Sequence, residues 1–152
     1  MKTKIANALK TKYATLGLSQ KAFDGVAAIL EKTIMAHPEL KWVMCGDFND
    51  QTREDSRWST LNPSRKYELH EMIRKAGFKD CIRIMNPDDW CRTMQTDAYA
   101  GTGGTYRLDY IYATEELADC MSAAGRIKDS FTDNASDHYP IYTVFDMTKL
   151  KY

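Results

Sequence analysis

Residues 42–49, Trp-Val-Met-Cys-Gly-Asp-Phe-Asn, decide the fold of this 152-residue chain. The apolar run that opens the stretch does not alternate with polar residues, which is typical of a strand buried on both faces. Asp47 and Asn49 follow where the strand passes into a loop. Loops at strand ends on a rigid sheet commonly carry catalytic groups. The stretch therefore predicts a buried strand that delivers two polar side chains to one edge of a sheet.

Two helices are predicted before this strand. Apolar residues recur at helical spacing from Ile5 to Leu16 and again from Phe23 to Ile34, with Gly17 as a stop between them. We expect residues 1–37 to form a helical hairpin packed on a main domain of residues 38–152.

The elements predicted after the strand are a helix and then several strands. The helix starts at Asn62 and Pro63, ends at Gly77, and is expected to bury Leu69, Met72, Ile73 and Ala76. Strands are predicted over 78–84, 106–112, 123–128 (an edge strand) and 139–147. A loop over 85–104 separates the first two of these strands, and a short helical turn over 114–117, capped by Thr114, follows the second. This order predicts an α/β layered domain.

Composition limits the classes of function. The 43% hydrophobic share fits a globular domain, and the balance of 21 basic and 21 acidic residues gives no support for binding nucleic acid by charge alone. The four cysteines form no metal-binding pattern, and no apolar run approaches the roughly 18 residues of a membrane span. We expect a soluble, cytoplasmic protein.

Three strand-end clusters are candidates for chemistry: Asp47 with Asn49, Asp109, and Asp137 with His138. Each also has a structural interpretation. The first could be a turn in which Asp and Asn bond their own backbone, and the last could be a polar loop.

Asp109 is the least easily explained as structural, because it lies in an otherwise apolar strand where an unpaired charge is costly. Its partner could be Arg107, in an internal ion pair, or a histidine whose imidazolium it would stabilise. A carboxylate paired with a histidine is the arrangement that orients an imidazole for proton transfer or charge stabilisation.

Segments 43–49, 106–111 and 136–141 resemble, in order, the last three signature motifs of the endonuclease/exonuclease/phosphatase superfamily, which includes deoxyribonuclease I. Residues 77–83 and Thr93 are similar to the segment that connects these motifs in the family. The resemblance covers about residues 30–148. It implies the C-terminal half of a deoxyribonuclease I-like α/β sandwich, a mostly antiparallel or mixed sheet with helices on one face.

The resemblance also implies a role for each candidate residue. Asp47 would orient or deprotonate the attacking water near a metal, and Asn49 would donate to a nonbridging phosphate oxygen. Asp137 would help to bind Mg²⁺ or Mn²⁺, and His138, oriented by Asp109, would contact the scissile phosphate. The implied reaction is metal-dependent hydrolysis of a phosphoester, with a nucleic-acid phosphodiester as the leading substrate and phosphatase or phospholipase substrates as alternatives.

Parts of the family pattern have no match in this sequence. The family opens with strands that end in an Asn and a Glu, both metal ligands, whereas residues 1–29 do not resemble those segments. Without that half, an apolar sheet face needs another cover: the N-terminal hairpin, a second copy of the chain, or a complementing N-terminal half. The alternatives are an enzyme completed by such a partner, a truncated and inactive relative, or a binding module without turnover.

Overall fold

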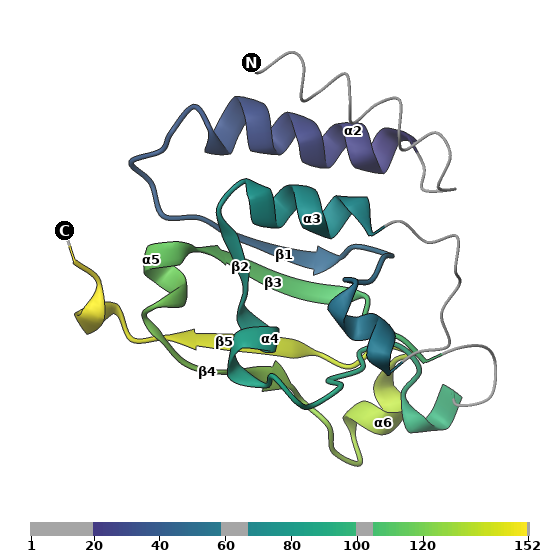
Figure 1. The fold of residues 1–152 in the computed structure, drawn as a ribbon. Helices are drawn as coiled ribbons and strands as arrows, with labels where there is room; N and C mark the ends of the chain where they lie inside the picture. The colour runs from purple at the N-terminus through teal and green to yellow at the C-terminus, as the bar shows by residue number, and fades with distance from the viewer. Residues whose placement is uncertain (1–19, 59–66, 100–104, 152) are drawn as a thin grey trace.

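The computed structural model describes residues 20–58, 67–99 and 105–151 (Figure 1). Within these ranges the strands form two antiparallel sheets. The first has the order β1 (Val43–Asp47), β3 (Asp109–Thr114), β2 (Phe78–Asp80), and the second pairs β4 (Met121–Arg126) with β5 (Ile141–Phe145).

Short helices connect and cover the strands. The α-helices are α2 (Gln20–Ile29), which continues as the π-helical turn η1 (Leu30–Ile34), α3 (Glu68–Lys75), α4 (Cys81–Met85), α5 (Glu115–Ala118) and α6 (Thr132–Ala135). The 3-10 turns are η2 (Glu54–Arg57), η3 (Asp97–Tyr99) and η4 (Met147–Lys149). No helix in the described ranges is long and apolar enough to cross a membrane.

The three-stranded sheet lies between two other layers (Figure 1). Helices α2 and α3 lie on one side, where Leu30, Leu69 and Ile73 pack with the β3 side chains Tyr110 and Tyr112. The alternate β3 residues point to the opposite side and pack with α4, α5, β4 and β5. The predicted α/β layered domain with antiparallel sheets is confirmed, with helices on both sides of the three-stranded sheet.

Helix α3 follows from its sequence pattern. Leu69, Met72 and Ile73 are buried at helical spacing, and Gly77 ends the helix with a φ of +94°, a conformation that glycine adopts without steric cost. Ala76, predicted to share the buried stripe, is exposed. The predicted start at residues 62–63 and the first helix of the N-terminal hairpin lie outside the described residues, whereas the second helix of the hairpin is α2 with η1.

Three predicted strands are shorter than expected, including the last, which spans Ile141–Phe145 and not 139–147. The strand predicted over 78–84 stops at Asp80, because the Asp80 carboxylate accepts the Arg83 N–H at 3.1 Å and caps α4. The strand predicted over 106–112 starts at Asp109, since Tyr106 pairs in an isolated bridge with Met94.

The prediction that the first strand is buried on both faces is wrong. Met44 faces the helices, but Val43 is 45% exposed and Cys45 is also exposed. Val43 and Cys45 lie opposite Ala113 and Ile111 in the β1–β3 register. Those β3 residues are covered by the layer that contains β4 and β5, whereas the same face of β1 remains open to solvent.

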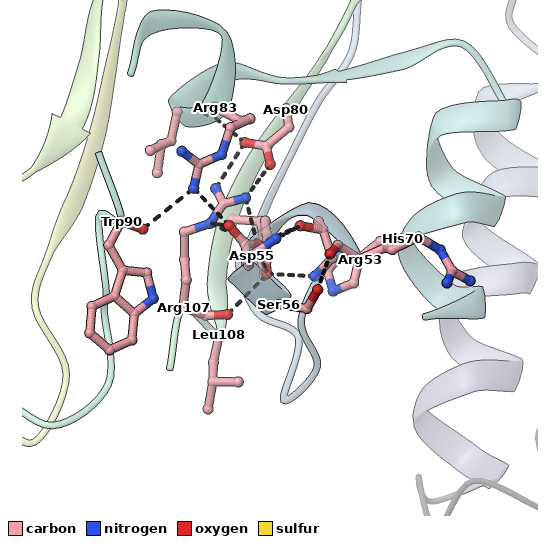
Figure 2. A network of polar contacts seen from close by, with 12 residues as sticks. Arg53, Asp55, Ser56, His70, Asp80, Arg83, Trp90, Arg107 and Leu108 are labelled. Atoms are coloured by element: carbon pink, nitrogen blue, oxygen red, sulfur yellow. Dashed lines mark hydrogen bonds and ion pairs between the residues drawn. The ribbon is translucent and has the colours of Figure 1, made fainter. Parts of the chain in front are cut away.

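The core of the domain contains an ion cluster centred on Arg107, which is fully buried (Figure 2). Its Nε donates to both carboxylate oxygens of Asp55 at 3.1 Å, and its Nη1 donates to Asp80 at 3.0 Å. Arg83 donates to Asp55 at 2.7 Å and the Tyr110 hydroxyl donates to it at 2.9 Å. The cluster therefore joins η2, the β2–α4 junction and the start of β3.

The cluster keeps its charges inside the protein. Burial alone would raise the pKa of Asp55, but the charge of Arg107 and the hydrogen bonds from Arg107, Thr52 and Arg83 outweigh it and lower the pKa below its ordinary value. Burial opposes the charge of Arg107 as well, yet Asp80 and Asp55 hold its pKa well above the ordinary range. Each charge therefore depends on its partners to remain buried.

We expect Asp55→Asn to lower the free energy of unfolding by about 3–5 kcal/mol, because it leaves Arg107 buried with half of its countercharge. Urea unfolding followed by circular dichroism measures the change. Glu71→Gln is the matched control, since it removes the partner of the exposed Arg53 and should cost under about 1 kcal/mol. A loss for Asp55→Asn no larger than that of the control would contradict this account of the cluster.

His70 lies on α3 and is only 1% exposed. Its Nδ1 lies 2.8 Å from the Tyr112 hydroxyl oxygen, and its ring packs against that of Tyr110 with 4.3 Å between centroids. Burial lowers the pKa of His70 to about 4. The folded protein therefore holds this imidazole in its neutral form at neutral pH.

This depressed pKa predicts a loss of stability in acid. The unfolded chain binds a proton to this histidine at about pH 6.5, whereas the folded chain does so only near pH 4. The free energy of unfolding should therefore fall by about 3 kcal/mol as the pH drops from about 6.5 to about 4. Urea titrations across this range should show a shallower fall for His70→Asn, and an unchanged fall for His37→Asn at an exposed site. Identical slopes for wild type and His70→Asn would rule the explanation out.

Candidate active site

The end of β1 and the start of β3 bring two carboxylates together. Asp47 lies directly opposite Asp109 in the antiparallel register, so both belong to the same face of the sheet. This is the face that carries Val43 on β1 and Ile111 on β3, away from α2 and α3. Like charges directly opposite each other are unfavourable, so this sheet end favours a positively charged group nearby.

His138 meets Asp109 at this sheet end. Its Nδ1 lies 2.8 Å from Asp109 Oδ2, and both side chains are mostly shielded from solvent. The predicted pairing of these residues is confirmed. The alternative pairing of Asp109 with Arg107 is wrong, because the Arg107 guanidinium is engaged by Asp55 and Asp80 in the core. Since Nδ1 faces the carboxylate, Nε2 is the ring nitrogen that remains for chemistry.

The segment after β1 forms the turn that its sequence allows. Asp47 Oδ1 accepts the Asn49 N–H at 2.8 Å, and Asp47 Oδ2 accepts from Asn49 Nδ2 at 3.1 Å. Asn49 adopts a φ of +51°, which asparagine tolerates better than most residues, and the Phe48 N–H donates to the Leu108 carbonyl at 2.9 Å. The turn is compatible with a functional role, because an ionised carboxylate and an amide have further sites for hydrogen bonds.

Asp137 is exposed beside the paired histidine. The loop that carries it is held from within: the Thr96 hydroxyl donates to the Ser136 carbonyl at 2.6 Å, and the His138 N–H donates to Ser136 Oγ at 3.1 Å. The backbone around Asp137 is therefore held by hydrogen bonds, and its side chain is exposed.

The segment over residues 93–97 was predicted only as a loop. It instead lies between the two parts of the site: Met94 forms isolated bridges with both Tyr106 and His138, and the Asp97 N–H donates to the Tyr139 hydroxyl at 3.2 Å. Thr93 and Thr96 are fully buried in this segment. The signal in the sequence was the similarity of Thr93 to the segment that connects the family's motifs, whereas the burial of both threonines is visible only in the structure.

The candidate metal ligands are Asp47 and Asp137, whose carboxylates suit a hard divalent cation. In the described part of the chain, no group of three or more His, Cys, Asp or Glu side chains gathers closely enough to hold a metal ion. The described residues thus provide carboxylates of the right chemistry and no complete metal centre.

The comparisons with known proteins agree with this fold. Residues 14–138 match the model of the Endonuclease/Exonuclease/phosphatase family. A search of curated proteins found no significant match. The matched segment makes up most of the sequence, so the chain belongs to the endonuclease/exonuclease/phosphatase family, whose members generally depend on divalent metal ions.

Solved structures similar to this chain include the 3'-5' exonuclease NExo from Neisseria meningitidis, at 19% identity with a TM-score of 0.64. Another is the 3' phosphatase NExo from Neisseria bound to a product DNA hairpin, at 20% identity and the same TM-score. Each match covers 86% of this chain and 56% of the other. The chain therefore has the deoxyribonuclease I-like fold and spans a little over half the length of these structures.

If the Asp109–His138 pair acts in catalysis, Asp109→Asn should lower the rate of phosphoester cleavage about as strongly as His138→Ala. We expect a loss of roughly 100-fold or more for each, the scale of general acid–base catalysis. Initial rates on an oligonucleotide measure it, with Asp119→Asn, an exposed aspartate after α5, as the control that keeps the wild-type rate. A near wild-type rate for Asp109→Asn beside a large loss for His138→Ala would remove Asp109 from the mechanism.

Proposed function

We propose that this chain is a metal-dependent phosphoesterase that hydrolyses phosphodiester bonds of nucleic acid with an activated water. The observation that carries the proposal is the Asp109–His138 pair, which lies beside Asp47 at one end of the layered sheets. Membership of a family of nucleases and phosphatases supports hydrolysis of a phosphoester as the reaction.

The side chains at the site have complementary tasks in this proposal. Asp47 orients or deprotonates the attacking water, since its carboxylate is held by Asn49 and retains free lone pairs. Asn49 uses its second amide hydrogen to donate to a nonbridging phosphate oxygen. His138, held by Asp109, directs Nε2 at the scissile phosphate and stabilises the negative charge that develops there.

A divalent cation, Mg²⁺ or Mn²⁺, completes this proposal. Asp137 and Asp47 would contribute carboxylate oxygens, and the cation would polarise the phosphoester. Because the described residues do not gather a complete centre, water and substrate phosphates would supply further ligands, and another polypeptide is an additional source. This need for further ligands links metal binding to the assembly of the whole site.

The open face of β1 supports a partner for the chain. Val43 is 45% exposed there, and Val144 on β5 is 49% exposed, so apolar strand residues of both sheets face solvent. The chain spans 56% of a similar structure, so a complementing half, expected from the sequence to be the N-terminal one, is one cover, and a homodimer is the other arrangement that would bury these residues. Size-exclusion chromatography with light scattering distinguishes a dimer from a monomer.

Nucleic acid is the proposed substrate class because one similar structure holds a product DNA hairpin. The second candidate function is a truncated relative or binding module that contacts phosphate without turnover. The incomplete metal centre of the described residues favours this alternative, and the retained Asp109–His138 pair opposes it.

The purified chain should cut plasmid and single-stranded DNA in Mg²⁺ or Mn²⁺, should stop in EDTA, and should lose about 100-fold or more of its rate in His138→Ala. The variant is the control against a contaminating nuclease, since a contaminant would survive the substitution. Cutting that persists in EDTA would contradict the metal dependence. Cutting that persists in His138→Ala, or no cutting in either metal, would contradict autonomous nuclease activity of this site. The last result would leave the complemented form as the species to assay.

A further inference from the structure

Thr93 contacts the backbone of Asp109 directly. Its hydroxyl oxygen accepts the N–H of Leu108 at 2.9 Å and the N–H of Asp109 at 3.1 Å. Its own N–H donates to the Tyr106 carbonyl at 2.9 Å. Thr93 is fully buried, so no water competes for these positions. The carboxylate of Asp109 therefore projects from a backbone whose position the Thr93 hydroxyl sets.

The same residue also holds the chain beside His138. The Thr93 carbonyl accepts the N–H of Tyr139, the next residue, at 2.7 Å. Met94, which follows Thr93, forms a bridge with His138 itself. One buried threonine thus has hydrogen bonds to both segments whose side chains form the carboxylate–imidazole pair.

We propose that Thr93 is a positioning residue for the Asp109–His138 pair. Its hydroxyl holds the Asp109 backbone, and its carbonyl holds the segment that carries the imidazole, so that Asp109 Oδ2 meets His138 Nδ1. The catalytic consequence of this inference rests on the proposed phosphoesterase function, whereas the placement of the two side chains can be tested without activity.

The hydroxyl is the part of Thr93 that matters. A hydroxyl oxygen has two lone pairs, and here both neighbouring N–H groups use them. Valine has nearly the same shape but no acceptor, so it would leave two buried N–H groups unsatisfied. The backbone of Asp109 would then move toward other acceptors, and a displacement of about 1 Å at a reacting group can cost about 100-fold in rate.

The test is the protonation site of the His138 ring in the full chain, read from its ¹⁵N NMR signals. At about pH 8.5 an ordinary imidazole is neutral, and a carboxylate at Nδ1 holds the single proton on that nitrogen. The His138 signals are assigned by their loss in His138→Gln. Wild type should show one dominant form with the proton on Nδ1.

Thr93→Val should convert this signal to a mixture of both ring tautomers, whereas Thr93→Ser, which keeps the hydroxyl, should restore the wild-type form. Thr114→Val is the matched control, because the Thr114 hydroxyl also accepts a backbone N–H, that of Trp42, but at the opposite end of β3. It should leave the His138 signals unchanged. An unchanged Nδ1-protonated form in Thr93→Val would overturn the inference.

If Thr93→Val does not fold, Thr93→Cys replaces it, since a thiol is only a weak acceptor, and the same readout applies. In an active preparation, Thr93→Val should also lose about 10- to 100-fold in kcat with little change in KM. The expected tautomer change in a chain that cleaves nothing would leave the positioning role standing and count against the proposed function. An active wild type with an unchanged kcat in Thr93→Val would support the proposed function and count against the positioning role of Thr93.

Discussion

The Arg107 guanidinium is fully buried, so water cannot hydrate its charge, and the segments packed around it have to supply countercharges. A buried guanidinium needs a countercharge, and its N–H groups need acceptors that lie in the plane of the group. Asp55 and Asp80 meet that demand from segments 52 and 27 residues away in the sequence. The loop after β1, the β2–α4 junction and the start of β3 are therefore held together where these charged side chains meet (Figure 2).

The same constraint reaches the candidate site through the chain itself. Arg107 lies two residues before Asp109, so the residue that anchors the core also fixes where the site carboxylate emerges. Around this anchor, β1 supplies Asp47 and the segment before β5 supplies His138. The site therefore lies where the two sheets meet. Its geometry depends on how segments that are far apart in the sequence pack against one another.

The sequence predicted the parts of this account that depend on local pattern. The non-alternating run at residues 42–45 predicted a strand, and Gly77 predicted the end of a helix, and both are present. The cost of burying Asp109 predicted a partner for its charge, and the structure shows that His138 is this partner. Such features follow from residues close together in the chain or from the cost of burying a single charge.

The features that the sequence did not predict depend on long-range contacts. An ion pair between Arg107 and Asp109 was one alternative from the sequence, and nothing local marks Asp55 as the partner of Arg107. His70 has the spacing of a surface residue, yet the rings of Tyr110 and Tyr112 enclose it. The exposure of Val43 depends on how far the second sheet extends beneath the first, which no local pattern encodes.

The central claim is that this site activates water to break a phosphoester bond. The most direct measurement is cleavage of an oligonucleotide with Mg²⁺ in ¹⁸O-labelled water, with mass spectrometry of the terminal phosphate of the product. Attack by solvent water on phosphorus predicts that the phosphate carries solvent oxygen, and that His138→Ala yields almost no labelled product. Unlabelled product, or equal labelling by His138→Ala, would contradict the account.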